Sequence, residues 1–368
     1  MGQFKRFVFA SLLILSLSSV VSAETYQLRQ VGSDLGIPWG MVFISDDEIL
    51  FTERAGKAGI LNTQSGRVVY LTGVPKVVVQ SQGGLLDVAK APDYVQGDWI
   101  YFTYSKSIKN QGVTTLARAH LNGSKLQDWD DLLLTHSGTD TNVHYGSRIA
   151  FDDSGHVYFS IGDRGIRANA QDLTLHAGSI VRLKRDGSIP VDNPFVDTAN
   201  ALPEIWSYGH RNPQGLVWDN DHKRLWSIEH GPRGGDEINL IEKGKNYGWP
   251  IISYGKEYWG LASVGEGTHK AGMEQPAKYY IPSIAPGSLL YYTGDSFPEW
   301  QGGLLAGALK LRHLNIVKLN EQGKVIAEER LLEDLNQRIR ALVQSPEGWI
   351  YFSTDRGNIY VLTPNKLN

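Results

Sequence analysis

His144 and Asp163 are the two residues whose types and positions best suit proton transfer. His144 lies in THSGTDTNVHYGSRIAF, just before a predicted strand, and Asp163 lies in SIGDRG, after the next predicted strand. In an antiparallel pair the start of one strand and the end of the next meet at the same edge. A histidine can take up a proton near neutral pH, and a neighbouring carboxylate can fix its tautomer and raise its basicity. An exposed loop histidine without a role is the alternative, which these two residues alone leave open.

Basic side chains form a second group. Arg338 and Arg340 flank Ile339 in RIR, and because side chains alternate along a strand, the two arginines share one face. Lys310 ends the apolar segment GALK, and Arg211 lies in GHRNPQGL. Cations gathered on one face need an anionic partner, and arginine suits planar carboxylates. We expect a basic mouth that binds a small polycarboxylate; solvated arginines on a sheet edge are the alternative.

The segment EHGPRGGDEINL, which begins at Glu229, combines glycine and proline with the acids Asp236 and Glu237. Exposed carbonyls and carboxylates are hard oxygen ligands, which suit Ca²⁺ rather than a transition metal. The spacing is not that of an EF-hand, and a turn with two solvated acids is the alternative.

Strands must position these residues, because long amphipathic helical patterns are scarce. A unit made of an apolar strand, a polar turn and an aromatic or β-branched strand recurs six times, from Trp39, Gly83, Gly146, Gln214, Gly287 and Ala341. Roughly 58 residues per unit suit a propeller blade with its loops. We therefore predict an all-β, six-bladed β-propeller as one domain over residues 24–368, since a β-sandwich would not explain six recurrences. Residues 254–280 break the pattern and predict a long loop over one face.

The first residues predict export. Lys5 and Arg6 precede an apolar run from Phe7 to Val21, and small residues lead to Ala23. This is the pattern of a signal peptide, residues 1–23, cleaved after Ala23. The run is too short to span a bilayer. We expect a periplasmic or secreted protein that is not an integral membrane protein.

The composition excludes several classes of protein. The 368 residues include no cysteine, which excludes disulfides, thiolate metal sites and iron–sulfur clusters. The net charge of −3 lacks the basic excess typical of nucleic-acid binding. We therefore expect no nucleic-acid partner, and we expect a monomer.

Seven motifs, in order along nearly the whole mature chain, resemble the pyrroloquinoline quinone (PQQ)-dependent aldose sugar dehydrogenases, relatives of soluble quinoprotein glucose dehydrogenase. They are QGGLLD at Gln82, VHYGSR with His144, GHRNPQGL with Arg211, EHGPRGGDE from Glu229, NYGWP from Asn246, GALK with Ala308 and RIR from Arg338. GHRNPQG together with HGP-GGDE is highly specific. Members of this family fold as six-bladed propellers, which agrees with the repeat count.

The resemblance implies oxidation of an aldose at C1 to a lactone, with hydride transfer to C5 of PQQ and passage of electrons to an unidentified external acceptor. His144 would be the general base that takes the proton of the anomeric hydroxyl. Asp163 would orient His144 and stabilise its charge. Arg211 would polarise the quinone carbonyl and stabilise the oxyanion that forms on it.

The resemblance also implies the residues that hold the cofactor and the metal. Those expected at PQQ, besides Arg211, are Gln82, Asn212, Tyr258, Ala308, Lys310, Arg338 and Arg340. The carbonyls of Gly231 and Pro232 would hold a Ca²⁺ that also binds the cofactor. Glu237 and the carbonyl of Tyr247 would bind a second Ca²⁺.

Two other functions remain open at this point. A calcium-dependent propeller lactonase would use a histidine to activate water at a central metal, and it needs acidic or amide ligands there. Lys310, Arg338 and Arg340 argue against it. A non-catalytic propeller that recognises a protein or glycan would leave His144 and Asp163 unexplained.

Overall fold

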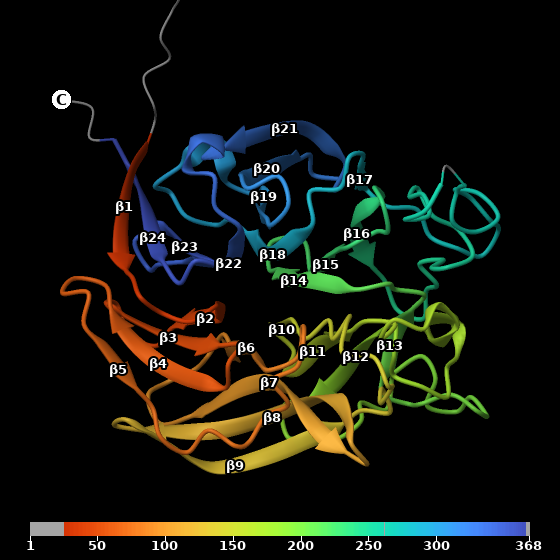
Figure 1. The fold of residues 1–368 in the computed structure, drawn as a ribbon, viewed down its shortest axis with the longest axis horizontal. Helices are drawn as coiled ribbons and strands as arrows, with labels where there is room; N and C mark the ends of the chain where they lie inside the picture. The colour runs from red at the N-terminus through yellow and green to blue at the C-terminus, as the bar shows by residue number, and fades with distance from the viewer. Residues whose placement is uncertain (1–25, 261, 366–368) are drawn as a thin grey trace, which may run out of the picture.

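The computed structural model describes residues 26–260 and 262–365. These residues form 24 strands in six four-stranded antiparallel sheets, which are arranged as blades around a central axis (Figure 1). The predicted six-bladed β-propeller is therefore confirmed. The predicted signal peptide lies outside the described residues. Within those two ranges, no helix has the length and apolar character needed to cross a membrane.

The six predicted units coincide with the six blades. Blade 1 contains β2 (Pro38–Phe43), β3 (Glu48–Glu53), β4 (Lys57–Asn62) and β5 (Val68–Tyr70). Blade 2 contains β6 (Leu85–Lys90), β7 (Trp99–Ile108), β8 (Gln111–Asn122) and β9 (Lys125–Leu134). Blade 3 contains β10 (Ile149–Phe151), β11 (His156–Ile161), β12 (Ser179–Lys184) and β13 (Ile205–Tyr208).

The other three blades follow in chain order. Blade 4 contains β14 (Pro213–Asp219), β15 (Arg224–Glu229), β16 (Asp236–Ile241) and β17 (Lys278–Tyr280). Blade 5 contains β18 (Pro286–Tyr291), β19 (Leu304–Ala308), β20 (Leu314–Leu319) and β21 (Val325–Leu331). Blade 6 contains β22 (Ile339–Gln344), β23 (Ile350–Thr354), β24 (Ile359–Pro364) and β1 (Tyr26–Gly32). Three short 3₁₀ turns complete the regular structure: Arg167–Gln171, Pro298–Trp300 and Glu333–Leu335.

Blade 6 closes the ring with strands from both ends of the chain. The first strand, β1, pairs antiparallel with the last, β24, from Tyr26 opposite Pro364 to Gly32 opposite Ile359. Figure 1 shows the two strands side by side, β1 in red and β24 in blue. This pairing closes the ring at the junction of the chain ends, with β1 as the outermost strand of blade 6. The sequence repeats did not reveal it, because β1 lies outside the first unit.

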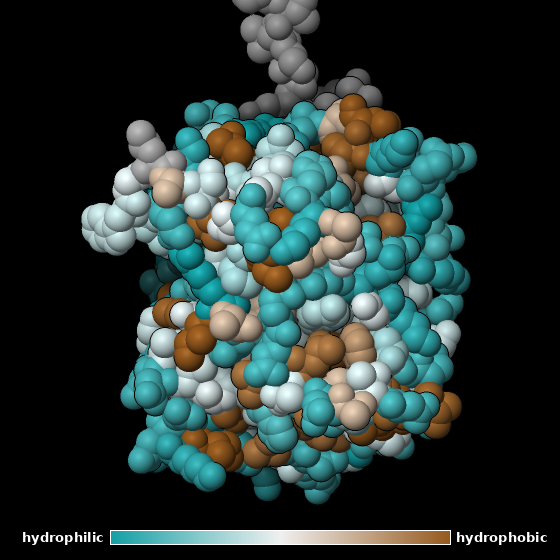
Figure 2. Space-filling view, turned by 90° about the vertical axis from the view of Figure 1, so that its right-hand side faces the viewer, coloured by the Kyte–Doolittle hydropathy of each residue, from teal (hydrophilic) through white to brown (hydrophobic). Residues whose placement is uncertain are grey.

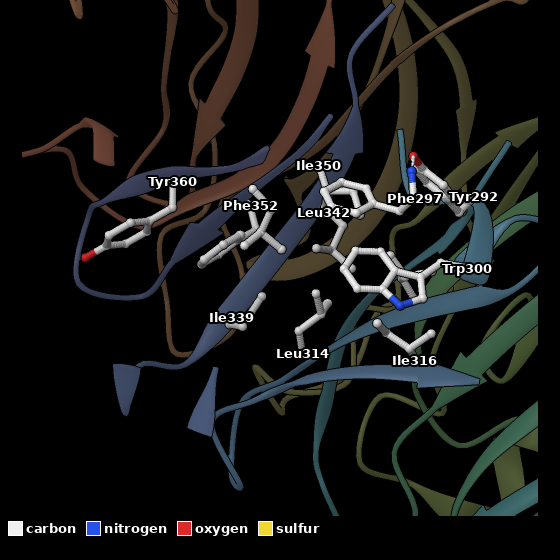
Figure 3. Close-up of a cluster of buried hydrophobic side chains, with 12 residues drawn as sticks. Tyr292, Phe297, Trp300, Leu314, Ile316, Ile339, Leu342, Ile350, Phe352 and Tyr360 are labelled. Atoms are coloured by element: carbon white, nitrogen blue, oxygen red, sulfur yellow. Dashed lines mark hydrogen bonds between the residues drawn. The ribbon is translucent and has the colours of Figure 1, made fainter. Parts of the chain in front are cut away.

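The apolar cores lie between blades, which explains why both faces of the strands are apolar. In β3, Leu50 packs against the blade 2 residues Leu85 and Phe102, whereas Phe51 packs against Tyr351 of blade 6. Alternation along the strand sends neighbouring side chains to opposite faces. Figure 3 shows the core between blades 5 and 6, where Trp300 lies over side chains of β20, β22 and β23. Each fully buried large side chain contributes about 1.5–3 kcal/mol.

The buried guanidinium of Arg148 joins the innermost strands at the propeller axis. Arg148 precedes β10 of blade 3 and is 6% exposed. Its contacts come from the other five blades: the ring of Trp39 at 3.9 Å, Oδ1 of Asp87 at 2.9 Å, and the carbonyl oxygens of Gln214 at 2.9 Å, Gly287 at 2.5 Å and Arg340 at 3.0 Å. A cavity of about 320 Å³ is lined by Arg148 and Asp87, but not by His144, Asp163 or Arg211.

The predicted long loop is present, with different bounds. The chain between β16 and β17 runs from residue 242 to residue 277, and Lys278–Tyr280 is a strand of blade 4. Figure 1 shows the loop in teal at the right of the ring. Figure 2 views the molecule from that side: hydrophilic residues cover most of the surface, and the hydrophobic residues form separate small groups.

Candidate active site

The strand arrangement brings His144 and Asp163 together. His144 lies in the loop before β10, and Asp163 follows β11, which pairs antiparallel with β10. Nδ1 of His144 is 2.6 Å from Oδ1 of Asp163. The predicted meeting of the two residues at one rim of the blade is confirmed by this distance.

Asp163 is an anion held in a buried position. Its side chain is 1% exposed. Gly165 donates its N–H to Oδ1 at 2.8 Å, and the indole N–H of Trp249 donates to Oδ2 at 2.8 Å. Burial alone would raise the pKa of Asp163, but the hydrogen bond and charge of His144, together with the Gly165 N–H and the charge of Arg211, hold this pKa below its ordinary value. An ionised Asp163 can therefore accept a hydrogen bond from Nδ1–H of His144, which leaves Nε2 free to accept a proton.

The backbone of His144 has an unusual conformation. His144 has a φ of 53°, in the left-handed region that residues other than glycine seldom adopt. Its N–H donates to Oε1 of Gln82 at 2.7 Å. A Cβ on Gly162 would lie 2.4 Å from the carbonyl oxygen of His144, so only glycine fits there. Gln82 and Gly162 thus hold the loop that presents the imidazole.

Glu229 holds the segment that carries Arg211 and Asn212. The backbone N–H groups of these two residues donate to Oε2 of Glu229 at 2.6 and 3.3 Å. Its other oxygen, Oε1, is 3.0 Å from Nδ1 of His210, whose Nε2 is 2.9 Å from Oγ of Ser207. The polar residues of GHRNPQGL thus have two different uses. The His210 side chain holds Glu229, which fixes the backbone. The side chains of Arg211 and Asn212 line cavities.

The guanidinium of Arg211 lies under the long loop. Nη1 donates to the carbonyl oxygen of His230 at 3.2 Å, and Nη2 donates to the hydroxyl of Tyr258 at 3.1 Å. The guanidinium carbon is 5.3 Å from the centre of the Trp249 ring. Tyr258 is 55% exposed, whereas Arg211 is 7% exposed, so the loop residue faces solvent and the guanidinium beneath it is covered.

Arg338 and Arg340 do share one face, and their anionic partner within the protein is Asp355. Nε of Arg338 is 2.7 Å from Oδ2 of Asp355, and Nε of Arg340 is 2.9 Å from Oδ1. Burial would raise the pKa of Asp355, but the charges and hydrogen bonds of the two arginines hold it below its ordinary value. A further arginine, Arg54, is near, since burial and the charge of Arg340 both lower its pKa. Three cations beside one anion leave a positive surplus.

An axial cavity collects several of the predicted cofactor residues. Gln82, Asn212, Arg338 and Arg340 line it, and its volume is about 130 Å³, several times that of a water molecule. Ala308 is buried at the end of β19, and the next residue, Leu309, also lines the cavity. Lys310 is exposed, and its ammonium has no hydrogen-bond or ion-pair partner among residues 26–260 and 262–365. The cavity is thus basic, with a further free cation one residue from its wall.

A second, acidic cavity lies beside the first. It is lined by Gly231, Glu237 and Tyr247 of the predicted metal residues, and also by Glu229 and Arg211. Its volume of about 10 Å³ suits one ion or water molecule. Pro232 does not line it; instead it packs against Gly255.

Glu237 shares the acidic cavity with a second carboxyl group, that of Glu229. Burial raises the pKa of Glu237 to about 8, and the charges of Glu229 and Asp236 add to this rise. In the described part of the chain, no three His, Cys, Asp or Glu side chains form a metal-binding group. A cation in this cavity would therefore depend on backbone carbonyls as well as carboxylates, the ligand mixture that Ca²⁺ accepts.

Several lining residues were not predicted. Among them are Trp39, Arg54, Tyr145, Gly146, Gln214, His230 and Leu309 in the axial cavity, and Trp249 and Glu229 in the acidic cavity. His230 lines both; burial lowers its pKa to about 4, and its Nε2 is 2.6 Å from the carbonyl oxygen of Pro286. Gln214, His230 and Trp249 lie inside motifs that were recognised. Arg54 lies in no such motif, and only its position after β3 places it at the axis.

The fold and the site together define a β-propeller protein in which a histidine pairs with a buried carboxylate next to a basic axial cavity. Residues 35–362 match the family described as Glucose / Sorbosone dehydrogenase. The chain belongs to this family, and membership supports an oxidoreductase that acts on sugars.

Individual relatives agree with this assignment. Aldose sugar dehydrogenase YliI of Escherichia coli is 38% identical over 357 residues, which cover 96% of each chain. The crystal structure of the soluble aldose sugar dehydrogenase of E. coli in its apo form matches with a TM-score of 0.88 and 37% identity, over 93% of this chain and 100% of that one. The PQQ-bound form of aldose sugar dehydrogenase from Streptomyces coelicolor matches with a TM-score of 0.76 and 25% identity, over 92% and 98%.

Proposed function

We propose that this protein is a PQQ-dependent aldose sugar dehydrogenase that oxidises the C1 hydroxyl of an aldose to a lactone. The observation that carries the proposal is the His144–Asp163 pair, 2.6 Å apart, beside a cavity lined by Arg338 and Arg340. A base and a polyanion site are the two parts that such an oxidation needs. The names of the E. coli and Streptomyces relatives support the substrate class and the cofactor.

The basic cavity fits a tricarboxylate quinone. Arg338 and Arg340 present guanidinium groups, which bind carboxylates with charge-assisted hydrogen bonds. Asp355 neutralises only part of their charge. Lys310, exposed and unpaired in the described structure, would add a third cation. Gln82, Asn212 and the buried backbone at Ala308 would provide further contacts, and Tyr258 would contact the cofactor from the loop.

Proton removal is the task of the chain's own residues. Asp163 holds Nδ1 of His144, so that Nε2 would accept the proton of the anomeric hydroxyl as C1 is oxidised. The charge of Asp163 would stabilise the imidazolium that results. Arg211 would stabilise negative charge on the quinone oxygen. PQQ, when bound, supplies the two-electron oxidant that accepts the hydride from C1, and an external acceptor would then remove the electrons.

Ca²⁺ fits the acidic cavity. Burial, together with the charges of Glu229 and Asp236, raises the pKa of Glu237 to about 8, so a cation there would relieve an unfavourable charge. Glu237 and the carbonyl of Tyr247 would be ligands, and Gly231 lines the same cavity. The carbonyls of Gly231 and Pro232 would bind a separate Ca²⁺ on the cofactor side. That ion, and not the one at Glu237, would act as a Lewis acid.

The lactonase alternative is less well supported. A catalytic Ca²⁺ on the propeller axis would need acidic or amide ligands without competing cations. Amide side chains do line the axial cavity, but so do Arg338 and Arg340, and the axis also carries the Arg148 guanidinium, so positive charge disfavours a metal ion there. A purely recognitional role would give no reason for the buried, anionic Asp163 to hold His144.

Reconstitution tests the proposal. The protein without residues 1–23 is mixed with PQQ, Ca²⁺, a redox dye and one aldose at a time. We expect dye reduction only when PQQ and sugar are both present, with lactone as the product. Failure to retain PQQ after desalting, together with no dye reduction, would refute the proposal.

A further inference from the structure

We propose that Trp249 is a positioning residue for the catalytic pair, and that its indole N–H fixes the carboxylate of Asp163 while its ring faces Arg211. This inference deepens the proposed function and rests on it. Trp249 lies in NYGWP and is 6% exposed. Its Nε1–H donates to Oδ2 of Asp163 at 2.8 Å.

The carboxylate of Asp163 is held through both of its oxygens. Oδ1 faces Nδ1 of His144 at 2.6 Å and the N–H of Gly165 at 2.8 Å. Among the described residues, the side-chain donor to Oδ2 is Trp249. The terminal torsion of an aspartate is broad and roughly two-fold, so donors on only one oxygen restrain it less. The indole N–H therefore sets the plane in which Oδ1 meets the imidazole.

Trp249 is itself rigidly placed. Its backbone N–H donates to the carbonyl oxygen of Gly209 at 2.9 Å, and its own carbonyl oxygen accepts the side-chain amide of Gln171 at 2.7 Å. Its side chain packs against Ala170 and Val264. Because its backbone N–H and C=O groups are both hydrogen-bonded and its ring is packed, Trp249 can hold the Asp163 carboxylate in a defined position.

The ring of Trp249 also lies near two arginines. The guanidinium carbon of Arg211 is 5.3 Å from the ring centre, and that of Arg167 is 5.5 Å away. Arg167 forms a bidentate ion pair with Glu257, in which Nη1–Oε1 and Nη2–Oε2 are both 2.7 Å apart. Glu257 precedes Tyr258, whose hydroxyl accepts a hydrogen bond from Arg211. The indole of Trp249 thus lies against both Asp163 and Arg211. It can therefore set the position of the His144–Asp163 pair relative to the guanidinium that is proposed to stabilise negative charge.

The variant Trp249→Phe tests the proposal, because it keeps an aromatic ring but removes the N–H. Trp300→Phe is the matched control, since Trp300 is a buried tryptophan whose Nε1 has no hydrogen-bond partner. For Trp249→Phe with PQQ we expect kcat to fall about tenfold or more, while KM and PQQ affinity change by less than about threefold. Trp300→Phe should leave kcat within about twofold.

A second readout needs no cofactor. The Nδ1 proton of His144, assigned by its absence in His144→Ala, should give a downfield proton resonance in the protein without PQQ. Trp249→Phe should move or abolish this resonance, and Trp300→Phe should not. Unchanged kcat with an unchanged resonance would overturn the proposal, as would a loss confined to PQQ affinity.

The kinetic and NMR measurements together also separate this inference from the proposed function. If the wild-type protein showed no PQQ-dependent oxidation, the proposed function would fail, and the His144 resonance would still decide the role of Trp249. If Trp249→Phe did not fold, the indole N–H resonance of Trp249 would be compared between wild type and Asp163→Asn. A shifted resonance supports the contact, and an unshifted one overturns it.

Discussion

His144 and Asp163 are 19 positions apart in the chain, yet Nδ1 of His144 lies 2.6 Å from Oδ1 of Asp163. The distance follows from two adjacent antiparallel strands, β10 and β11, whose ends meet at one edge of blade 3. Because Asp163 is buried and its pKa is lowered, it stays anionic and orients the imidazole. The account of the site depends first on this pair.

His144→Ala should lower kcat by about 10²–10⁴-fold, because the variant lacks the group that takes the substrate proton. PQQ affinity should stay within about threefold of wild type, since His144 does not line the axial cavity. Steady-state kinetics and PQQ titration measure both. His222→Ala, in an exposed turn between β14 and β15, is the control and should retain full activity. Loss of PQQ binding with normal turnover at saturation would contradict the role of His144.

Asp163→Asn should reduce stability in a pH-dependent way. Folding lowers the pKa of Asp163, so its ionised form stabilises the fold above the unfolded value of about 3.9, and this contribution is lost as the pH falls through the folded value. We expect the difference in unfolding free energy between wild type and variant to be full at pH 6 and to shrink below about pH 4. Urea denaturation across this range measures it. A difference that did not change with pH would show that the carboxylate charge does not act in this way.

Arg338→Ala should weaken PQQ binding about tenfold or more, because a charge-assisted hydrogen bond contributes about 1.5–3 kcal/mol. The hydride-transfer rate at saturating PQQ should change less. Arg330→Ala, on β21 and paired with Glu328, is the control and should bind PQQ normally. Equal PQQ affinity in Arg338→Ala and wild type would refute the basic cavity as the cofactor site.

Ca²⁺ should stabilise the protein more at pH 8 than at pH 5. Without metal, the raised pKa of Glu237, about 8, means that stability is greatest below its unfolded value of about 4.3 and falls as the pH rises towards 8. Ca²⁺ would compensate the carboxylate that forms there. Thermal unfolding with Ca²⁺ or with chelator at each pH measures the effect. Glu237→Gln should remove the pH dependence of the stabilisation by Ca²⁺. If Ca²⁺ raised the Tm of wild type and Glu237→Gln equally at each pH, the ion would bind elsewhere.

Arg148→Met should destabilise the fold by about 3–5 kcal/mol, because it leaves the carboxylate of Asp87 buried without its partner. The double variant Asp87→Leu/Arg148→Met should recover part of this loss, since no buried charge then remains unpaired. Chemical denaturation of the three proteins forms the test. If the loss of unfolding free energy in the double variant equalled the sum of the losses in the two single variants, the two residues would act independently.

Much of the fold was readable from the sequence because a propeller repeats one local pattern. Each unit begins within a few residues of an innermost strand, as with Gln214 and β14. The closure by β1 was not readable, since pairing between Tyr26 and Pro364 joins the chain ends and leaves no local signal. The loop bounds were wrong at residues 278–280 because β17 is only three residues long.

The site was partly readable for a similar reason. Strand alternation placed Arg338 and Arg340 on one face, and the strand order placed Asp163 beside His144. Asp355 was not predicted as the partner of the arginines, because it belongs to the turn after β23, and register across strands decides that contact. Arg148 was missed for a different reason: its importance comes from carbonyl groups of separate blades, which have no sequence signature.

The most direct test of the central claim uses glucose carrying deuterium at C1, mixed without oxygen with the PQQ- and Ca²⁺-loaded protein. Removal of hydride from C1 predicts a lactone that has lost the deuterium, formed together with reduction of the bound quinone. Reduction of the quinone should be slower than with unlabelled glucose. A product that retains the deuterium at C1, or sugar that leaves the quinone oxidised, would contradict the account.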